Sequence, residues 1–301
     1  MVSITHKQTT LRKAVAGAFV DVSKPETIEA VVHKRVPKGD VFEFSRAAGL
    51  LAIKKTSDVI PDCHPLPVEF ASIQFTVEGL RIGITVEVHT VYKTGVEVEA
   101  MHGASIVALV IYDMLKPIDP AVSISSIALV SKSGGKKDRA PLPGNLRTAV
   151  IVCSDSISQG QKEDRSGKRM VELLQTFGIA SPDYRVISDD PSGIAATLKD
   201  CVDAAYDLVL FTGGTGLSRR DHTPEAIRPM ISVEIPGIPE TARQYGQQHT
   251  PTAMLSRGVA GFAGDTLVLT FPGSVRGVEE TMEALFPQVL HVFEVRNNKP
   301  H

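Results

Sequence analysis

The pattern of hydrophobic and polar positions in the N-terminal part of the chain predicts helices mixed with antiparallel strands. Residues 80–88 alternate apolar and polar side chains, which is the period of a half-buried strand, and Glu78-Gly79 supplies a hairpin turn before them. Residues 99–115 are rich in Ala, Ile, Val and Leu and stop shortly before Pro117, which predicts a largely buried helix. Further elements are predicted as helices near residues 24–33 and 43–55 and a strand near residues 122–130. We therefore expect an α+β fold here, an antiparallel sheet with helices.

The C-terminal part follows a different pattern, in which short apolar runs alternate with helical stretches. The strand-like runs are residues 148–153, 206–211 and 266–271, and the helical stretches lie near residues 166–177, 192–204 and 276–295. This alternation is typical of βαβ units, so we expect an α/β fold, a mostly parallel sheet with helices on both faces. Sheets of this type bind ligands at the carboxyl ends of their strands.

Between these two patterns lies a segment that we interpret as a linker. Residues 134–145 contain almost no apolar side chain and are punctuated by Gly and Pro. The length of 301 residues is about twice the ~150-residue prior for one domain. We predict a first domain over residues 1–138, a linker over residues 139–146 and a second domain over residues 147–301.

Composition and charge remove several classes of protein from consideration. Hydrophobic residues make up 43% and charged residues 22% of the chain, which excludes a disordered or coiled-coil protein. Lys plus Arg (32) nearly balance Asp plus Glu (34), which argues against nucleic acid or an anionic membrane as a partner. The first residues lack the apolar core of a signal peptide, and no apolar run approaches the ~20 residues of a membrane span. We expect a cytoplasmic protein whose partners are small molecules.

Three candidate ligand-binding loops follow the predicted strands of the second domain. They are Ser154-Asp155, the run Thr212, Gly213, Gly214, Thr215 and Gly216, and the turn Gly273-Ser274. Glycine beside a hydroxyl side chain lets backbone N–H groups approach an anion such as a phosphate. Neither the dinucleotide-binding nor the P-loop fingerprint is complete, so an ordinary tight turn is the alternative for the glycine-rich run.

Motifs in the second domain occur in an order that matches a known family. They are Ser154-Asp155 through Gly160, Asp164-Arg165-Ser166-Gly167, the run from Thr212 to Glu225, Ile235-Pro236-Gly237, Leu255-Ser256-Arg257 and Pro272-Gly273-Ser274. Over about residues 147–295 the chain resembles the molybdopterin adenylyltransferases of the MogA/MoaB type. The resemblance implies adenylylation of molybdopterin with ATP as co-substrate and Mg²⁺, in a protein that is typically a trimer.

The same resemblance implies roles for individual residues. By position, Asp189 and Asp221 are catalytic carboxylates, and the three loops bind pterin and phosphates. A carboxylate beside a triphosphate can bind Mg²⁺, and Asp221 is the expected ligand. The alternative for Asp221 is a charge near the start of a helix at Thr223-Pro224-Glu225. His222 and Ser274-Val275-Arg276 depart from the family pattern, which leaves pterin binding without adenylylation as an alternative.

In the first domain, Asp113 and Lys116 are three residues apart in the predicted helix, so that a carboxylate can orient an ammonium on the same face. A surface salt bridge is the alternative. The surrounding helix looks buried, and a buried lysine shifts its pKa readily and can act as an acid or a base.

Cysteine chemistry is limited in this chain. Cys63, Cys153 and Cys201 are far apart and form no C-x-x-C pair, which excludes a disulfide framework and indicates a reducing compartment. His64 follows Cys63, but no second cysteine is near and no H-x-x-x-H spacing exists. We therefore favour ligand hydrogen bonding over a metal site for this pair.

The motifs of the first domain match a second family. They are Lys38-Gly39-Asp40-Val41, Ala47-Ala48-Gly49, Lys54-Lys55-Thr56, and residues 60–66, 93–100, 112–116 and 132–136. Over residues 1–138 the chain resembles cyclic pyranopterin monophosphate synthase, of the MoaC type. The resemblance implies conversion of 3',8-cyclo-dihydro-GTP into cyclic pyranopterin monophosphate with release of pyrophosphate. It also implies a hexameric assembly with sites at interfaces and no required cofactor.

By position in that family, the residues take two roles. The catalytic residues are Lys38, Asp113 and Lys116, and the substrate-binding residues are Cys63, His64, Glu97, Val98, Glu99, Lys54, Lys55 and Lys132. Rearranging a purine into a pterin needs repeated proton transfers, and expelling pyrophosphate needs cations on its oxygens. Two departures are the missing aspartate after Met1-Val2 and the charged Asp62.

We therefore expect a bifunctional, homo-oligomeric enzyme of molybdenum cofactor biosynthesis. The alternative is an N-terminal synthase fused to a C-terminal module that binds pterin or promotes oligomerisation without turnover. An unrelated nucleotide-binding α/β protein fits the ordered motifs of both halves poorly.

Overall fold

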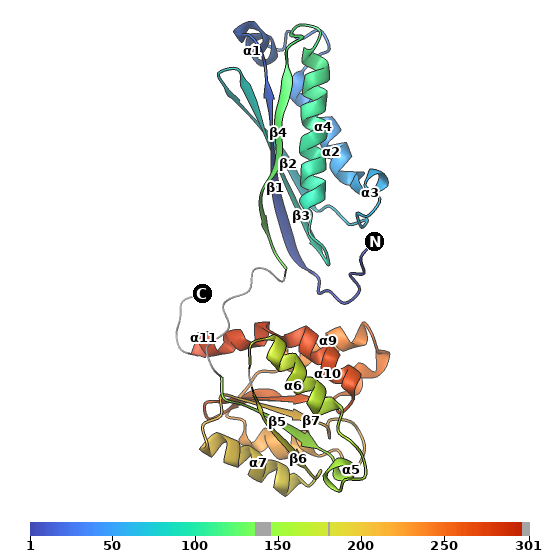
Figure 1. The fold of residues 1–301 in the computed structure, drawn as a ribbon, viewed down its shortest axis with the longest axis vertical. Coiled ribbons are helices and arrows are strands. Elements are labelled where there is room, and N and C mark those ends of the chain that lie inside the picture. Colours follow the sequence, from blue (N-terminus) through green and yellow to red (C-terminus); the bar gives the residue numbers. More distant parts are fainter. Residues whose placement is uncertain (136–145, 180, 297–301) are drawn as a thin grey trace. The chain divides into compact units, whose positions relative to one another are not determined.

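The computed structural model describes residues 1–135, 146–179 and 181–296. The chain divides into two compact units, Met1–Asp138 and Arg139–His301, and each is described by itself (Figure 1). Apart from Leu146, the predicted linker over residues 139–146 lies outside the described residues.

Unit 1 is built on a four-stranded antiparallel sheet in the order β2-β3-β1-β4. Helices α2 and α4 pack together on one face of this sheet (Figure 1). The strands are β1 (Thr10–Asp21), β2 (Phe70–Glu78), β3 (Arg81–Tyr92) and β4 (Ser123–Ser133), and the helices are α1 (Pro25–Val32), α2 (Val41–Lys54), α3 (Thr56–Val59) and α4 (Glu97–Leu115). The predicted α+β fold is confirmed.

Small side chains let α4 lie close to the sheet and to α2. Strand β1 presents Ala14, Ala16 and Ala18 to the core, each at most 1% exposed. A Cβ atom added at Gly103 of α4 would lie 2.6 Å from the Ile53 side chain, so only glycine fits where the two helices cross.

Helix α4 begins two residues before the helix predicted over 99–115, and its 19 residues correct the expectation that no apolar run approaches the length of a membrane span. Among the described residues it is the one helix whose length and composition would suffice to cross a membrane. Nine of its residues are nevertheless buried in the unit, and seven of these belong to the hydrophobic core. Its position is that of a core helix.

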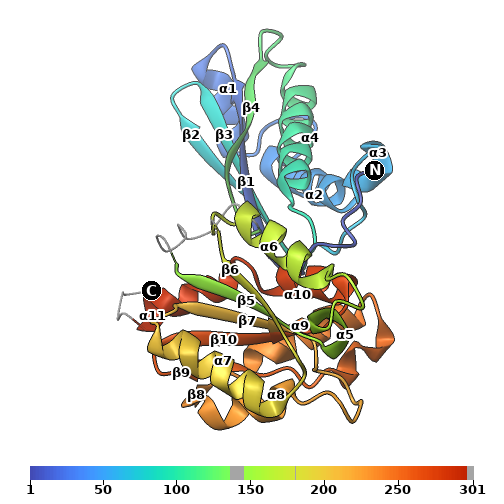
Figure 2. The same cartoon turned by 60° about the horizontal axis from the view of Figure 1, so that its bottom comes forward.

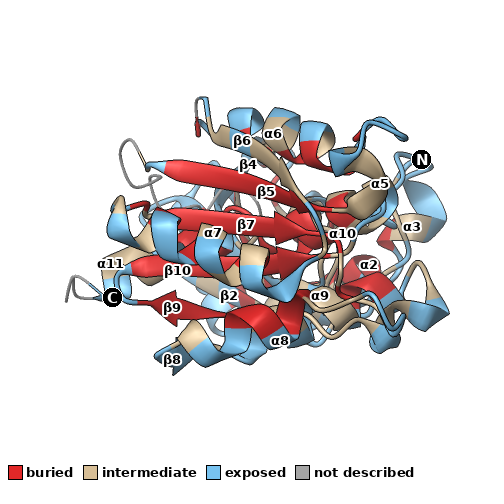
Figure 3. Cartoon of the chain, turned by 90° about the horizontal axis from the view of Figure 1, so that it is seen from below, coloured by how far each residue is buried: buried red, intermediate tan, exposed pale blue. Residues whose placement is uncertain are grey.

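Unit 2 is built on a six-stranded, mostly parallel sheet in the order β6-β5-β7-β10-β9-β8. The first four strands in this order are parallel, β9 is antiparallel to β10, and β8 is antiparallel to β9. The strands are β5 (Thr148–Cys153), β6 (Asp183–Ile187), β7 (Leu208–Thr212), β8 (Val233–Glu234), β9 (Ala260–Ala263) and β10 (Thr266–Phe271). Strands β5, β7 and β10 are buried along their whole length (Figure 3).

Helices cover both faces of this sheet, which confirms the predicted α/β fold. Helices α6 (Ser166–Thr176), α9 (Gly237–Gln247) and α10 (Val275–Leu285) share a core on one face (Figures 1 and 2). Helices α7 (Pro191–Asp203) and α8 (Thr223–Ile227) pack on the other face. The remaining short elements are α5 (Asp155–Ser158), α11 (Val292–Arg296) and 3₁₀ turns at Arg228–Met230, Pro251–Leu255 and Gln288–His291.

Several elements differ from the sequence prediction. The helical stretch predicted over 276–295 is interrupted after Leu285, where Pro287 cannot continue a helix. Strands β1 and β2 in unit 1 were not predicted, nor were β6, β8, β9 and α9 in unit 2. Strand β1 is the notable omission because it is central in its sheet, and three of its four buried positions are alanines, which have low strand propensity.

Candidate active sites

Lys38, Asp113 and Lys116 form one cluster in unit 1. The Lys116 Nζ lies 2.8 Å from Asp113 Oδ1, across one turn at the end of α4. The Lys38 Nζ, from the loop before α2, donates to Asp113 Oδ2 at 2.7 Å and to the Asp113 carbonyl oxygen at 2.9 Å. One carboxylate therefore holds two ammonium groups side by side.

Electrostatics favour the charged forms of Asp113 and Lys116 in this cluster. The hydrogen bonds from Lys116 and Lys38 lower the pKa of Asp113 to about 2, and Asp113 raises the pKa of Lys116. The Lys116 side chain is 51% exposed. The expectation of a buried lysine is wrong for the single chain: the Lys116 side chain is half exposed, and Asp113 stabilises its charged form. A cavity of about 500 Å³ adjoins Lys38 and Asp113.

Glu99 and Cys63 form a second cluster, near the first turn of α4. Glu99 is 2% exposed, and burial raises its pKa. The Cys63 Sγ–H donates to Glu99 Oε1 at 3.1 Å. Burial and this hydrogen bond raise the pKa of Cys63 to about 12, so the thiol is neutral at physiological pH. Glu99 Oε2 is buried without a hydrogen-bond partner among the described residues, and it is available to a ligand.

The other predicted substrate-binding residues of unit 1 are spread around this second cluster. Glu97 Oε1 lies 2.6 Å from Lys132 Nζ; burial works to raise the pKa of Glu97, but the Lys132 ammonium outweighs it, and the pKa is lowered. Val98 is 43% exposed and His64 is half-buried. Lys54 and Lys55 are exposed at the end of α2, where Lys55 pairs with Asp58 at 3.0 Å.

Asp62, which departs from the family pattern, pairs with the amino-terminal ammonium of Met1 at 2.9 Å. Its carboxylate is 82% exposed, so this pair contributes little to stability. The negative charge next to Cys63 is thus partly neutralised from within the chain.

The two clusters of unit 1 lie at opposite ends of α4. Glu97 begins the helix and Asp113 is in its last turn. Sixteen residues at a rise of about 1.5 Å each separate them by about 24 Å along the helix axis. One chain by itself does not bring the predicted catalytic residues to the predicted substrate-binding residues.

In unit 2, the three predicted loops do meet at one edge of the sheet. Strands β5, β7 and β10 end in register, with Val152 and Phe271 both opposite Thr212. The Thr212 hydroxyl donates to the Pro272 carbonyl oxygen at 2.8 Å, and a Cβ added at Gly273 would lie 3.2 Å from the Gly213 Cα. The carboxyl ends of the strands thus place these loops in contact, as in other parallel sheets.

The glycines of the 212–216 run are required by its geometry. Gly213 and Gly214 have φ angles of 102° and 62°, in the left-handed region that favours glycine. A Cβ at Gly213 would overlap the Cys153 carbonyl oxygen, and one at Gly214 would overlap Thr223 Oγ1. The Thr223 hydroxyl in turn donates to the Gly213 carbonyl oxygen at 3.0 Å.

Three carboxylates lie around this loop. The backbone N–H groups of Asp155 and Asp189 donate to each other's side chains. Burial, together with the negative charges of Asp155 and Asp221, raises the pKa of Asp189. Its Oδ1 is buried and has no partner among the described residues. Asp221 Oδ2 accepts the Ser218 N–H at 2.8 Å, a bond within its own loop. The alternative expected for Asp221 was a charge near the start of the helix at Thr223, and α8 begins without a side-chain capping hydrogen bond.

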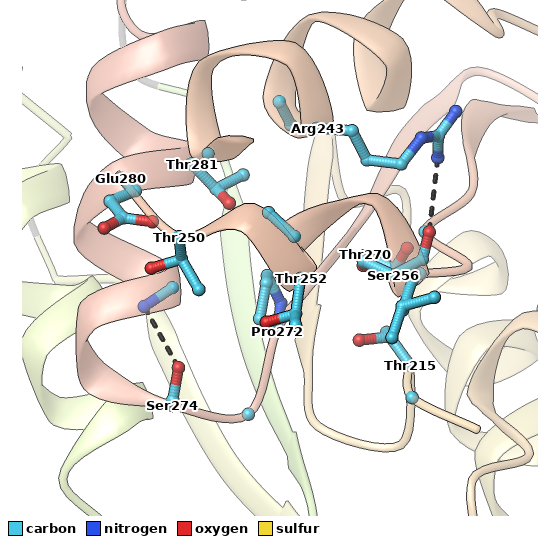
Figure 4. A pocket seen from close by; sticks show the side chains of 18 of the residues that line it. Thr215, Arg243, Thr250, Thr252, Ser256, Thr270, Pro272, Ser274, Glu280 and Thr281 are labelled. Atoms are coloured by element: carbon cyan, nitrogen blue, oxygen red, sulfur yellow. Dashed lines mark hydrogen bonds between the residues drawn. The ribbon is translucent and has the colours of Figure 1, made fainter. Parts of the chain in front are cut away.

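A cavity of about 770 Å³ opens beside the loop, a size typical of small-molecule sites (Figure 4). Of the predicted residues, Gly214, Thr215, Gly216, Asp221, Gly273 and Ser274 line it. The cavity lining does not include Ser154, Asp155, Thr212, Gly213 or Asp189. Asp189 Oδ1 would lie 3.4 Å from a Cβ added at Gly214. The cavity is completed by α9, α10 and the Pro251–Leu255 turn.

Comparison with known proteins matches a different family model to each of the two units. The model of the MoaC family matches residues 1–135, and one described as a probable molybdopterin binding domain matches residues 149–291. A protein of Chlorobaculum tepidum, named molybdenum cofactor biosynthesis bifunctional protein, is 38% identical over 301 residues, covering 100% of this chain and 96% of that protein. The chain belongs to this bifunctional family.

Each half of the bifunctional protein also has relatives of its own. A cyclic pyranopterin monophosphate synthase of Pelotomaculum thermopropionicum is 44% identical over 138 residues, which cover 45% of this chain and 81% of that protein. The crystal structure of the molybdopterin biosynthesis enzyme MoaB from Thermus thermophilus is 38% identical, with a TM-score of 0.48, and the match covers 52% of this chain and 98% of that one.

Sequence reasoning gave no role to several residues around the cavity of the bifunctional protein. Arg257 was noted only as part of the motif Leu255-Ser256-Arg257, yet its side chain binds the 215–221 loop. Arg243 lines the cavity and donates to the Ser256 carbonyl oxygen at 3.5 Å (Figure 4). These arginines come from segments without predicted strands, and their targets are backbone carbonyls, which leave no mark in a sequence.

Proposed function

We propose that unit 1 is a cyclic pyranopterin monophosphate synthase, which converts 3',8-cyclo-dihydro-GTP into cyclic pyranopterin monophosphate and pyrophosphate. The observation that carries this proposal is the shared carboxylate of Asp113, which holds the ammonium groups of Lys38 and Lys116 next to each other. Two adjacent cations suit an anionic leaving group such as pyrophosphate. The identity to named synthases supports the assignment.

The second cluster of unit 1 supplies the proton chemistry in this proposal. Glu99 is buried with a raised pKa and one free carboxyl oxygen, so it can hold a proton and hydrogen-bond a substrate ring. Because α4 separates Glu99 from Lys116, we propose that a complete site combines opposite ends of α4 from two chains of a homo-oligomer. Product analysis by mass spectrometry with 3',8-cyclo-dihydro-GTP tests the function: formation of the cyclic pterin with one pyrophosphate supports it, and no product contradicts it.

We propose further that unit 2 transfers AMP from ATP to molybdopterin. The observation that carries this is the cavity of about 770 Å³, in which the glycine loop, Asp221 and the Gly273-Ser274 turn meet. Backbone N–H groups of a glycine loop can bind phosphate oxygens, and adenylyl transfer asks a protein mainly for positioning and charge neutralisation.

The carboxylates of unit 2 fit a Mg²⁺ ion that arrives with the nucleotide. Among the described residues no three His, Cys, Asp or Glu side chains are grouped as a complete metal site. Mg²⁺ bound to a nucleotide needs only one or two protein carboxylates, because phosphates and water supply the other ligands. Asp221, which lines the cavity, would hold it, and it would neutralise charge on the phosphates.

One observation favours the alternative that unit 2 binds pterin without turnover. In the turn that departs from the family pattern, Arg276 pairs with Glu280 at 2.7 Å and donates to the His249 carbonyl oxygen at 3.0 Å. The Arg276 guanidinium is therefore paired with groups of the protein itself instead of with a phosphate.

The test compares wild type with Asp221→Asn, measuring AMP-pterin formation and molybdopterin binding separately. Adenylylation predicts that wild type forms the adduct and that the variant binds pterin but turns over at least ~10-fold more slowly. Pterin binding without any adduct under saturating Mg-ATP replaces the transferase by the binding module. No pterin binding contradicts both. In either case we propose a cytoplasmic protein with small-molecule partners.

A further inference from the structure

The loop from Thr215 to Asp221 has few bonds of its own. Within it, the Asp221 N–H donates to the Ser218 carbonyl oxygen at 3.0 Å, and the Ser218 N–H donates to the Asp221 side chain. These bonds close the tip of the loop only. Leu217 in the tip is 66% exposed, so no apolar core fixes the position of the loop.

The two limbs of the loop are joined by Arg257. Its Nε donates to the Gly216 carbonyl oxygen at 2.7 Å, and its Nη2 donates to the Asp221 carbonyl oxygen at 2.7 Å. The remaining nitrogen, Nη1, pairs with the Glu225 carboxylate in α8. The Arg257 backbone N–H also donates to the Thr215 carbonyl oxygen at 2.9 Å. One side chain thus binds the start of the loop, its end and the helix that follows.

We propose that Arg257 is a positioning residue of the C-terminal site, which holds Asp221 at the cavity wall. This inference rests on the proposed function of unit 2. Asp221 and Gly216 both line the cavity, whereas Arg257 lies behind them and is not among the lining residues. The Asp221 carboxylate packs against Gly216, where an added Cβ would lie 2.9 Å from Oδ2, so a shift of either limb displaces the carboxylate.

The guanidinium group suits this task better than an ammonium. It is planar and carries five N–H donors in a fixed arrangement, so it can serve two carbonyls and one carboxylate at once. Lysine can reach one or two of these acceptors but cannot hold their relative positions. Arg257→Lys should therefore be intermediate between wild type and Arg257→Gln.

The experiment measures AMP transfer, molybdopterin affinity and amide hydrogen exchange in the full-length protein. For Arg257→Gln we expect kcat to fall about 10- to 100-fold, with the Kd for molybdopterin changed less than ~3-fold. We expect amides 216–221 to exchange about 10-fold faster. Arg228→Gln is the matched control: this exposed arginine pairs with Glu234 at 3.6 Å and does not line the cavity.

A double-mutant cycle separates positioning of Asp221 from a general structural effect. In an Asp221→Asn background, Arg257→Gln should lower kcat by less than ~3-fold, because the group that it positions is already lost. An equal loss in both backgrounds, or unchanged kcat and exchange in both Arg257 variants, overturns the inference. If wild type forms no AMP adduct, the proposed transferase activity is contradicted, and amide hydrogen exchange of Arg257→Gln tests the inference separately. Faster exchange confined to the loop supports the inference, and unchanged exchange overturns it. Should Arg257→Gln not fold, Arg257→Lys is measured in the same way.

Discussion

Asp155 and Asp189 exchange hydrogen bonds between two loops: the Asp189 N–H donates to Asp155 Oδ1 at 3.1 Å, and the Asp155 N–H donates to Asp189 Oδ2 at 3.3 Å. Two hydrogen bonds that involve like-charged side chains therefore connect the loops after β5 and β6. The arrangement carries an electrostatic cost, because the pKa of Asp189 is raised by burial and by the neighbouring carboxylates.

We predict that Asp189→Asn stabilises unit 2 at neutral pH. The raised pKa means that the folded state binds this proton more tightly than the unfolded state does, so stability falls as the pH rises from the ordinary Asp pKa of 3.8 through the folded pKa. The amide oxygen can still accept the Asp155 N–H. A gain of about 1 kcal/mol is expected at pH 7, or roughly 2–4 °C in Tm.

Thermal unfolding at several pH values checks this prediction. The gain should vanish below the ordinary Asp pKa of 3.8, where wild-type Asp189 is protonated in both states. Asp200→Asn, at an exposed position in α7, is the control and should show no such change. A stabilisation that is equal at low and neutral pH would contradict the electrostatic explanation.

We predict that Lys116→Ala abolishes cyclic pyranopterin formation without unfolding unit 1. The ammonium is half exposed and paired only through an i,i+3 contact, so its loss should change the free energy of unfolding by less than ~1 kcal/mol. Synthase turnover and thermal unfolding are measured on the same preparation. Lys24→Ala, at another exposed position, should retain turnover. Wild-type turnover in Lys116→Ala would show that this ammonium has no part in the reaction.

We predict that Asp119→Ala strongly destabilises unit 1. Asp119 is 0% exposed and accepts four hydrogen bonds, from the Ser23 N–H and hydroxyl, the Thr27 hydroxyl and the Ala121 N–H. Burial works to raise its pKa, but these donors outweigh it, and the pKa is lowered. Removing the carboxylate leaves these donors unpaired, among them the buried Thr27 hydroxyl, at a cost of about 3 kcal/mol.

Urea unfolding of Asp119→Ala and of Ser23→Ala, which removes one of the four donors, gives a graded comparison. Because the folded pKa is lowered, the contribution of Asp119 is present above the ordinary value of 3.8 and is lost as the pH falls through the folded pKa. The difference between wild type and Asp119→Ala should therefore shrink in acid. Equal effects of the two substitutions would show that the network as a whole contributes little.

We predict that Gly214→Ala is far more damaging than Gly160→Ala. Both glycines have positive φ angles, 62° and 71°, so each alanine carries a similar backbone penalty of about 1 kcal/mol. Only at position 214 would the new Cβ overlap Thr223 Oγ1, whereas nothing lies within 4 Å at position 160. The expected excess is about 2 kcal/mol by thermal unfolding, partly relieved by adding Thr223→Ala. Equal losses would mean that the loop has room to adjust.

The elements that could be predicted are those whose pattern stands out within a short window. Strand β10 has the predicted bounds, and α4 differs from its prediction by two residues at its start, because both are continuous apolar runs with clear ends. Strand β6 is short and half-exposed, and it carries Asp183 and Arg185. Because β6 was not predicted, the contact between Asp155 and Asp189 could not be predicted either, since Asp189 follows that strand.

The candidate sites divide along similar lines. The three loops of unit 2 could be expected to meet, because the ends of adjacent parallel strands share one edge of a sheet. The hydrogen bonds of Arg257 could not be predicted from the sequence, because their acceptors are backbone carbonyls whose directions depend on the folded loop. In unit 1, motif matching assigned catalytic and substrate-binding residues without placing them relative to one another, whereas the rise of the helix itself places Glu97 and Asp113 far apart.

The separation imposed by α4 has a genetic consequence if complete synthase sites form only between chains. A chain with Lys116→Ala keeps an intact Glu99 end, and a chain with Glu99→Gln keeps an intact Lys116 end. Mixed assemblies of the two would contain some sites in which neither altered residue is present. Two alleles that are each null would then complement each other, whereas two alleles altered at the same end of the helix would not.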